Sequence, residues 1–517
     1  MFTNLNRREF IKNIGLISSL ITISGSSLSC SKESEKIISQ YQSNLIDRKN
    51  IQNLNFLFIV IDDLNDFCSP YNGYPGAHTP NIAKLASEST VFNNAFCSVP
   101  VCGASRASIL SGLDPNTTKL YRQNLLIEEF KSNQKYFDRK KIELKTIPRQ
   151  MKELGYKTYG AGKIYHNAGY EKKPGKGLGN YEKEIWDDFL TMDYSTMHPD
   201  GYDLDFPNRR NLIGNRFGEK YSDCESAMPD SLTTDWCVNK LQMNHNSPFF
   251  LFAGIHKPHL SWYVPKRFYD LYPLDSIKTP NLDEELNDLN DIPNLAVKEF
   301  KLNGADQKDL VKRNLIAGAI RAYLANISFA DECVGNIINA LNQSQYKDNT
   351  VICLLSDHGW FLGEKLGWRK FKLWEKATRV PMMIKHPKLT NGQFCNSIVS
   401  TLDIFPTILD ILGVENQSNL DGISFKDLIY TPNLGSNRFA VSNWKMHKGK
   451  SIARSIRTNS WRYIKYNDRN EELYRHNFVD ARKERTNLLH VSNLTSEYRN
   501  IADKLNNQLN NYLSSLR

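Results

Sequence analysis

Three continuous apolar runs are the clearest structural signal along the chain, at residues 54–61, 249–254 and 350–355. Runs that are apolar at successive positions are typical of strands buried on both faces, as in the centre of a parallel sheet. Helical patterns lie between the runs, a short one at 80–87 and a long one at 315–341. Strands that alternate with helices predict an α/β fold, here a large mixed or parallel sheet flanked by helices.

Each apolar run stops at polar residues. Asp62 and Asp63 follow the first run, His256 closes the second, and Asp357 and His358 follow the third. In open α/β sheets, ligands bind beyond the carboxyl ends of the strands. These residues are therefore expected to share one active site.

The pattern changes after residues 402–406. Short alternating stretches at 451–457 and 461–466 predict antiparallel strands, and 496–513 predicts an amphipathic helix. We therefore expect a catalytic α/β domain at 55–400 and a carboxyl-terminal subdomain at 401–517, with a smaller antiparallel sheet plus a helix. Residues 270–309 are acidic, Asn-rich and interrupted by prolines, which predicts a surface excursion.

The amino terminus is interpreted as an export signal rather than as part of the fold. Arg7 and Arg8 precede an apolar, Ser-rich stretch at 14–28, which is short for a membrane span and is typical of a twin-arginine export signal at 1–29. A frayed basic terminus with a small apolar helix is the alternative. Cys30 opens a polar linker at 30–54 and is a candidate lipid acceptor, although Ser27 stands where lipoproteins usually carry Leu. The expected location is the periplasm, or the outer membrane or cell surface of a bacterium as a lipoprotein.

Composition excludes wholesale disorder, with 40% hydrophobic and 24% charged residues. The 66 Lys+Arg exceed the 56 Asp+Glu by 10; without residues 1–29 the balance is 63 minus 55, or +8. The basic residues are scattered, and no nucleic-acid motif is present, so no nucleic-acid partner is expected. Nine cysteines without a CxxC pair argue against a disulfide framework, and Cys224 with Cys237 is the nearest candidate bridge.

The carboxylates at the strand ends predict a metal site. Adjacent carboxylates such as Asp62 and Asp63 repel each other and favour a cation. With Asp357 and His358, the ligand set is rich in oxygen and has one nitrogen, which suits Ca²⁺ or Mg²⁺ better than Zn²⁺. Taken alone, Asp-Asp after a strand is more often a helix cap or a solvated turn.

A second motif changes that balance. Cys102 is followed by Ser105 and Arg106, and the helical run after them ends at Ser111-Gly112. This segment resembles the type I, formylglycine-dependent sulfatase family of the alkaline phosphatase superfamily, whose signature is Cys-x-Pro/Ala-Ser-Arg. The resemblance covers about 55–489, with further matching segments at 162–166, 254–259, 356–364, 368–370 and 377–381. Segments 117–121, 163–166 and 256–259 resemble the iduronate-2-sulfatase branch, which includes bacterial polysaccharide sulfatases.

The resemblance implies a mechanism. In that family the Cys is oxidised to formylglycine, whose hydrated form attacks sulfur with one hydroxyl and expels sulfate through the other. One Ca²⁺ per chain would be bound by Asp62, Asp63, Asp357 and His358 together with the modified Cys102. A formylglycine-generating or sulfatase-maturating enzyme is the implied partner. Ala104 replaces the usual Pro and Ser111 the usual Thr, so activation depends on a maturation enzyme that accepts Ala.

The resemblance also implies the roles of the remaining site residues. Arg106 would orient the diol, and Lys163 and Lys370 would contact sulfate oxygens. His166 and His256 are candidates for proton transfer, with His256 as the acid to the leaving alcohol. Sugar contacts are expected from Lys163, His256, His259, Lys370 and Trp360, with Trp262 and Trp368 as further candidates. Core packing is an equal alternative for each Trp.

The expected function is hydrolysis of sulfate esters in a sulfated, uronic-acid-containing polysaccharide or its oligosaccharides, such as an ulvan-like algal polymer or a glycosaminoglycan. Two alternatives stay open at this point. One is a phosphodiester or phosphonate hydrolase of the same superfamily, because sulfate and phosphate esters share a tetrahedral shape. The other is a catalytically inactive glycan-binding surface protein.

Overall fold

The computed structural model describes residues 54–122, 134–140, 142–143, 145–166, 170–171, 184–190, 192–193, 225–260, 262–414, 420–434, 437–447, 451–476, 484–490 and 495–516. The predicted export signal, Cys30 and nearly all of the predicted linker lie outside these residues. All of the described residues belong to one compact unit. Among the helices described, none has a stretch long and apolar enough to cross a bilayer.

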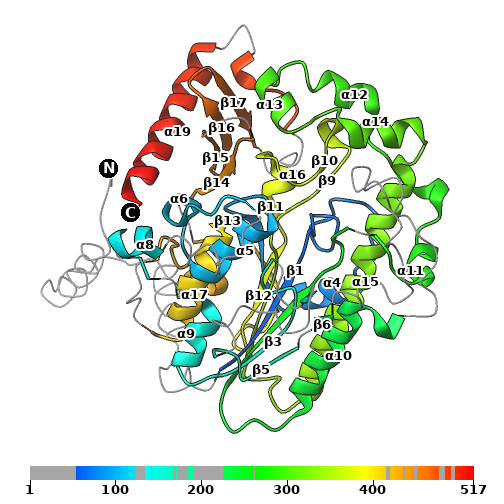
Figure 1. The fold of residues 1–517 in the computed structure, drawn as a ribbon, viewed down its shortest axis with the longest axis vertical. Coiled ribbons are helices and arrows are strands. Elements are labelled where there is room, and N and C mark those ends of the chain that lie inside the picture. The colour runs from blue at the N-terminus through cyan, green and yellow to red at the C-terminus, as the bar shows by residue number, and fades with distance from the viewer. Residues whose placement is uncertain are drawn as a thin grey trace, which may run out of the picture. The chain divides into compact units, whose positions relative to one another are not determined.

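A nine-stranded mixed sheet forms the centre of the molecule, with helices on both faces (Figure 1). Its middle strand, β1 (Asn55–Ile61), pairs in parallel with β7 (Phe249–Ile255) and with β8 (Thr350–Ser356). Every residue of these three strands is buried. The three continuous apolar runs therefore correspond to central strands, as predicted.

The register of the three strands aligns their carboxyl ends. Ile61 lies opposite Ile255 on one side and opposite Ser356 on the other. Because the strands are parallel and end at the same level, the residues that follow them meet at one edge of the sheet.

The outer strands make the sheet mixed. On one side, β3 (Lys157–Gly162) pairs in parallel with β7, and β5 (Asp188–Leu190) with β3. On the other side, β12 (Met382–Lys385) runs antiparallel to β8 and to β2 (Thr90–Phe96). The edge is completed by β11 (Arg379–Val380), antiparallel to β2, and β13 (Gln393–Ser400), parallel to β2.

Alternating side chains of β1 enter two separate cores. Leu57, Ile59 and Ile61 pack with α4 (Pro80–Ala86), α10 (Pro229–Gln242) and α15 (Ile316–Gln343). On the other face, Phe56, Phe58 and Val60 pack with α5 (Cys102–Ser111), α9 (Ile147–Glu153) and α17 (Ile404–Ile411). Helix α18 (Lys426–Tyr430) joins the second core. Both α17 and α18 thus belong to the layer around the large sheet, while the predicted division at residue 400 stays a prediction.

A four-stranded antiparallel sheet and a long helix lie in the carboxyl-terminal region, as predicted. The strands are β14 (Ala440–Lys445), β15 (Ile452–Arg457), β16 (Trp461–Asn467) and β17 (Asn470–Arg475). Helix α19 (Thr495–Ser515) packs on this sheet through Ala502, Leu505 and Leu509.

The predicted surface excursion contributes to a core. It begins at the last residue of α11 (Lys266–Asp270), contains α12 (Leu282–Asn287) and α13 (Asn294–Glu299), and ends within α14 (Ala305–Lys312). Ala296 and Phe300 are buried with Trp374 and Trp444, so this segment supports one face of the small sheet. The remaining short elements are α6 (Pro115–Thr118), α8 (Gln134–Lys140), β4 (Tyr170–Glu171), β6 (Met192–Asp193), β9 (Phe361–Leu362), β10 (Trp368–Arg369) and α16 (Glu375–Thr378).

The described cysteines are free thiols. Cys237 is one of them and is fully buried in α10. The structure therefore does not support the bridge predicted between Cys237 and Cys224, which itself lies outside the described residues. Burial among apolar side chains explains Cys237 as a small core residue.

Candidate active site

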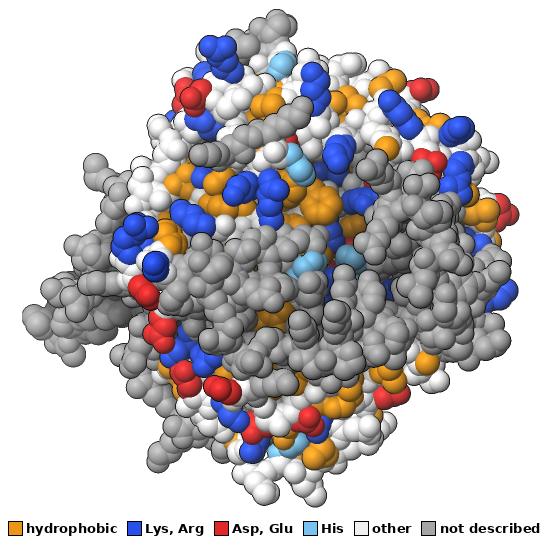
Figure 2. Space-filling model, in the orientation of Figure 1, with side chains coloured by type: hydrophobic (Ala, Val, Ile, Leu, Met, Phe, Trp, Pro, Cys, Tyr) orange, Lys and Arg blue, Asp and Glu red, His pale blue; other side chains and the backbone are white. Residues whose placement is uncertain are grey.

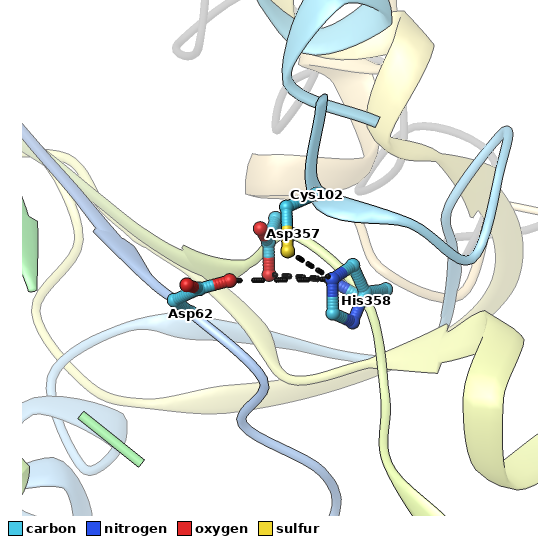
Figure 3. A group of neighbouring side chains, drawn as sticks. All are labelled: Asp62, Cys102, Asp357 and His358. Carbon is cyan, nitrogen blue, oxygen red and sulfur yellow. Dashed lines mark hydrogen bonds and ion pairs between the residues drawn. The ribbon is translucent and has the colours of Figure 1, made fainter. Parts of the chain in front are cut away.

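Four predicted residues converge at the carboxyl edge of the large sheet. Figure 3 shows the side chains of Asp62, Cys102, Asp357 and His358 pointing toward one another. Nε2 of His358 lies 3.2 Å from Sγ of Cys102, 3.6 Å from Oδ1 of Asp357 and 4.0 Å from Oδ1 of Asp62. All four are fully buried.

The first turn of α5 explains the spacing of the Cys102 motif. Residues three and four positions apart share one face of a helix, so Ser105 and Arg106 lie beside Cys102. Nε of Arg106 donates a hydrogen bond to Oδ2 of Asp357 at 2.9 Å, and Oγ of Ser105 donates to the Asp357 carbonyl. Nη1 of Arg106 also donates to the carbonyl of Lys163. The motif thus fixes the amino-terminal end of α5 against Asp357, which follows strand β8, and Cys102 faces the carboxylates.

Asp63 and Lys370 form the second side of the site. Nζ of Lys370 lies 2.5 Å from Oδ1 of Asp63 and 2.9 Å from Sγ of Cys102. Asp63 has a φ of 65°, a left-handed conformation that turns the chain away from β1, and its N–H donates to Asp357. Arg369 and Phe371, on either side of Lys370, also have positive φ, at 69° and 72°. The local backbone is therefore bent so that Lys370 points inward.

Two glycines position Lys163. Gly162 has a φ of 72°, and a Cβ on Gly254 would lie 2.2 Å from the Lys163 carbonyl carbon. Side chains at either position would be strained or would clash. The close approach brings the N–H of Lys163 within 2.8 Å of the Gly254 carbonyl, and Nζ of Lys163 contacts Asp62.

His256 is held in place by Asp230, a residue that the sequence reasoning missed. Asp230 accepts the backbone N–H groups of His256 and Lys257 at 2.7 and 2.8 Å. Burial raises the pKa of Asp230 to about 6, although these hydrogen bonds oppose the shift. An acid after Pro229 at the start of a helical pattern looks like an ordinary helix start, so the sequence carries little signal of this contact.

The three other histidines of the predicted site differ in exposure, and His256 is buried. The rings of His256 and His259 are 4.8 Å apart, and Nε2 of His259 is 3.9 Å from Oδ2 of Asp63 with 25% of its side chain exposed. His166 is partly exposed. Burial and the ammonium of Lys163 lower the pKa of His166 to about 4 and hold that of His256 well below its usual range. Both rings are therefore neutral at pH 7.

The pKa values of Asp62 and Asp63 are shifted in opposite directions. Burial raises the pKa of Asp63 to about 7 despite Lys370. Burial also acts on Asp62, but Lys163, His259 and Arg106 outweigh it and hold the pKa of Asp62 well below its usual range. Burial alone would raise the pKa of Cys102, yet Lys370, Lys163 and His358 bring it below that of an ordinary thiol. The lowered pKa reflects the three cations around the Cys102 sulfur, and the carboxylate of Asp62 opposes it.

The donor set fits a hard divalent cation. Oδ1 of Asp62 and Oδ2 of Asp63 are buried and accept no hydrogen bond from the residues described. Ligand atoms of Asp62, Cys102, Asp357 and His358 lie within 4.8 Å of one another. Buried carboxylate oxygens without donors are costly unless a cation is bound. The carboxylate of Asp357 and the sulfur of Cys102 raise the pKa of His358 to about 9 against the effect of its burial. A divalent cation would take the place of that proton.

The structure does not support Trp360 as a sugar contact. Trp360 and Trp262 are each 1% exposed, and their ring centroids lie 6.1 Å apart in the core. Trp368 is also buried. The ring of Trp360 instead lies 5.3 Å from Nζ of Lys370, so it lines the buried side of that ammonium. Large aromatic rings bury much apolar surface, which explains why these three side chains lie in the core.

The Sulfatase family model matches residues 54–414, which span all of these site residues. The chain belongs to the sulfatase family. A second model, the carboxyl-terminal part of N-sulphoglucosamine sulphohydrolase, matches residues 357–515. This sulfatase is therefore a sulfuric ester hydrolase with an alkaline-phosphatase-like fold.

Individual relatives agree with this assignment. The sulfatase is 32% identical over 443 residues to a protein named Sulfatase from Formosa agariphila, covering 83% of this chain and 82% of that one. It is 28% identical over 509 residues to human iduronate 2-sulfatase, covering 83% and 87%. The structure of BT1596, a 2-O GAG sulfatase, aligns with a TM-score of 0.65 and 20% identity over 89% of this chain and 92% of that chain, which shows a shared fold.

Proposed function

We propose that this sulfatase is a Ca²⁺-dependent formylglycine enzyme that removes sulfate esters from a sulfated, uronic-acid-containing glycan. The observation that carries the proposal is the position of Cys102 Sγ, within hydrogen-bonding distance of Lys370 and His358 and beside carboxylate oxygens that lack donors. This is where a nucleophile, a metal ion and a sulfate group would have to meet.

Two groups would complete the site. Oxidation of Cys102 to formylglycine would supply a hydrated aldehyde as the nucleophile. A bound Ca²⁺ would polarise the sulfate oxygens as a Lewis acid. Asp62, Asp63, Asp357 and His358 would hold the ion, and their oxygen-rich set favours Ca²⁺ or Mg²⁺ over Zn²⁺.

The chain's own cations and histidines would handle the remaining charge. Lys163 and Lys370 would stabilise negative charge on the sulfate oxygens, and Arg106 fixes the position of residue 102 through Asp357. His256 is neutral before substrate binds. A sulfate anion beside it would raise its pKa, so that it can carry the proton that the leaving alcohol needs.

The relatives' names support the proposed substrate class. Human iduronate 2-sulfatase and a 2-O GAG sulfatase are both named for uronic acid or glycosaminoglycan substrates. We extend this to glycosaminoglycan or ulvan-like oligosaccharides. The twin-arginine segment supports export to the periplasm or cell surface, with Cys30 as a candidate lipid anchor and a maturation enzyme as a required partner.

Sulfate release tests the proposal. The enzyme, co-expressed with a maturation enzyme, is incubated with dermatan sulfate or ulvan oligosaccharides in millimolar Ca²⁺, and free sulfate is measured by ion chromatography. We expect sulfate from at least one glycan with the natural chain and none with Cys102→Ala. Cys353→Ala, in buried strand β8, is the matched control and keeps activity. Hydrolysis of a phosphodiester without release of sulfate from any sulfate ester would overturn the proposal.

A further inference from the structure

Basic side chains gather beside the active site on one face of the molecule. Figure 2 shows Lys and Arg side chains in a row over α6, β14 and β15, next to histidines near the centre of that face. Described members of this group, which we call the basic rim, are Lys119, Arg122, Lys445 and Arg454. None of them has a role in the site described above.

A single residue, Asn116, contacts two members of the rim. Asn116 accepts a hydrogen bond from Nη2 of Arg454 through its Oδ1 at 2.8 Å, and its carbonyl accepts one from Nζ of Lys119. Nδ2 of Asn116 donates to Oδ1 of Asn443 at 2.9 Å, which ties α6 to β14. Two cations from distant parts of the sequence are thus fixed close to each other.

The strand register adds a third cation. Asn443 lies opposite Arg454 in the β14–β15 ladder, and Lys445 lies opposite Ile452. Because side chains alternate along a strand, Lys445 shares the face of Asn443 and Arg454. Arg122 reaches the same region, with its Nη2 3.5 Å from the carbonyl of Met446.

Asp114 balances the rim only in part among the described residues. It forms no ion pair with Lys119 or Arg454, and it accepts from Asn116 and from the hydroxyl of Tyr512 at 2.7 Å. Burial lowers the pKa of Lys119 and of Arg454, and Asp114 opposes both shifts, while repulsion by Lys140 and Arg454 lowers that of Lys119 further. Nε of Arg454 is buried and has no hydrogen-bond partner among the described residues. Several cations held beside a single carboxylate favour binding of an anion.

The rim is connected directly to the catalytic loop. Phe371 follows Lys370, and its N–H donates to the Pro100 carbonyl at 3.1 Å. The N–H of Asn443, which lies opposite Arg454, donates to the Ser98 carbonyl at 2.8 Å, so the rim and the Lys370 loop both contact the segment that leads into Cys102. A saccharide whose sulfate lies at Lys370 would therefore extend toward the rim.

We propose that the basic rim binds a second acidic group of the substrate, a sulfate or carboxylate on a sugar next to the one that is desulfated. This rests on the proposed function, and it assigns the substrate class further: a polyanionic oligosaccharide rather than a singly sulfated sugar. The basic rim contributes to the free energy of glycan binding and takes no part in hydrolysis of the sulfate ester.

Binding tests the rim without turnover. In a Cys102→Ala background, the affinity for dermatan sulfate and ulvan oligosaccharides is measured by calorimetry for the natural rim and for Lys119→Gln with Arg454→Gln. We expect affinity for the bound glycan to fall about tenfold or more and to depend less on salt. The matched control is Lys84→Gln with Lys347→Gln, two exposed lysines on α4 and after α15, and it keeps the affinity. Equal affinity in rim and control variants overturns the proposal.

Kinetics separate this proposal from the proposed function. In the active enzyme, the ratio of kcat/KM for the oligosaccharide to kcat/KM for 4-nitrophenyl sulfate should fall about tenfold in the rim variant. If Arg454→Gln fails to fold, Lys119→Gln with Arg122→Gln replaces it, since both side chains are exposed. An unchanged ratio contradicts the rim. Glycan binding that depends on the rim without any sulfate release would contradict the proposed function alone.

Discussion

Two of the buried clusters of charged side chains in the described part of the chain differ in how their polar atoms are satisfied. The catalytic cluster is formed by Asp62, Asp63, Asp357 and His358 with Lys163 and Lys370. The second, which we call the arginine network, consists of Glu375, Glu484 and His476 with Arg457 and Arg462. In both, candidate ligand atoms lie within 4.8 Å of one another, so proximity alone does not distinguish them.

Hydrogen bonds distinguish the two clusters. In the network, Arg462 donates to Glu484 at 2.6 Å, to Glu375 at 2.5 Å and to Ser455 at 2.7 Å. His476 lies 2.9 Å from the same Glu484 oxygen. Oε1 of Glu375 lacks a partner, but its other oxygen meets both arginines. Guanidinium groups occupy the positions that a metal ion would need.

In the catalytic cluster, the guanidinium of Arg106 bonds Asp357, whereas Asp62 and Asp63 contact the ammonium groups of Lys163 and Lys370. One oxygen of Asp62 and one of Asp63 accept no hydrogen bond from described residues. An ammonium group acts as a point charge, whereas a guanidinium forms a rigid fork. The first cluster can accept an ion and a substrate, and the second is complete without either.

The largest expected effect is on catalysis. Lys370→Met should lower kcat/KM by about 10²–10³, because it removes a donor aimed at the developing charge. Activity on 4-nitrophenyl sulfate in millimolar Ca²⁺ measures this. Lys385→Met, which removes an ion pair to Glu88 at the end of strand β12, is the control. A loss of kcat/KM below tenfold for Lys370→Met would mean that Lys370 does not stabilise the developing charge.

The corresponding change in the network should affect folding. Arg462→Met is expected to lower the free energy of unfolding by about 3–5 kcal/mol, since two buried carboxylates lose their shared partner. Turnover per folded molecule should stay the same. Urea unfolding measures the loss, and the exposed Arg475→Met should change stability by less than about 0.5 kcal/mol. Equal stability of the two variants would mean that the network is not structural.

Calcium should bind only the catalytic cluster. At a concentration of 100 times Kd, Ca²⁺ should raise the free energy of unfolding by about 2.7 kcal/mol. Melting temperatures in Ca²⁺ and in EDTA check this. The shift should disappear in Asp62→Asn with Asp63→Asn and persist in His476→Gln. A shift that is lost only in His476→Gln would reverse the assignment of the two clusters.

The smallest expected effect is a dependence of stability on pH that has opposite signs in the two clusters. Without metal, the raised pKa of Asp63, about 7, means that the folded chain retains a proton that the unfolded chain has lost. This contribution to stability therefore declines as pH rises from about 4 to 7. Asp63→Asn in EDTA should be more stable than the natural chain at pH 7.5 by at least about 1 kcal/mol.

The network should respond in the other direction. Arg457, His476 and Arg462 hold the pKa of Glu375 below its usual range despite burial. Its contribution is present above the ordinary glutamate pKa and is lost as pH falls below it. Urea unfolding at several pH values follows both contributions. If the free energy of unfolding changed with pH by the same slope in the natural chain and in Asp63→Asn, the pKa of Asp63 would not be raised in the folded chain.

Much of this organisation could be predicted from the sequence. Continuous apolar runs identify central parallel strands because both faces are buried, and the polar residues after them must then share one edge. Ser105 and Arg106 were recognised through the motif, and their helical spacing explains their contacts with Asp357. Edge strands such as β11, with two residues, are too short to give a pattern.

Contacts between distant segments could not be predicted. Asp230 reaches His256 across 26 positions, and nothing in its local sequence indicates that partner. Trp360 next to His358 could face a sugar or the core, and only packing against Trp262 decides. The basic rim depends on Asn116 joining α6 to β15, a contact between residues 338 positions apart.

The central claim is that Cys102 becomes the catalytic group of a sulfatase. Peptide mass spectrometry of the segment containing residue 102, from protein that releases sulfate, tests it most directly. The account predicts a fraction of peptide lighter than the cysteine form by about 18 Da, as expected for formylglycine, that rises in proportion to specific activity. Full activity in protein whose residue 102 is entirely unmodified cysteine would contradict the account.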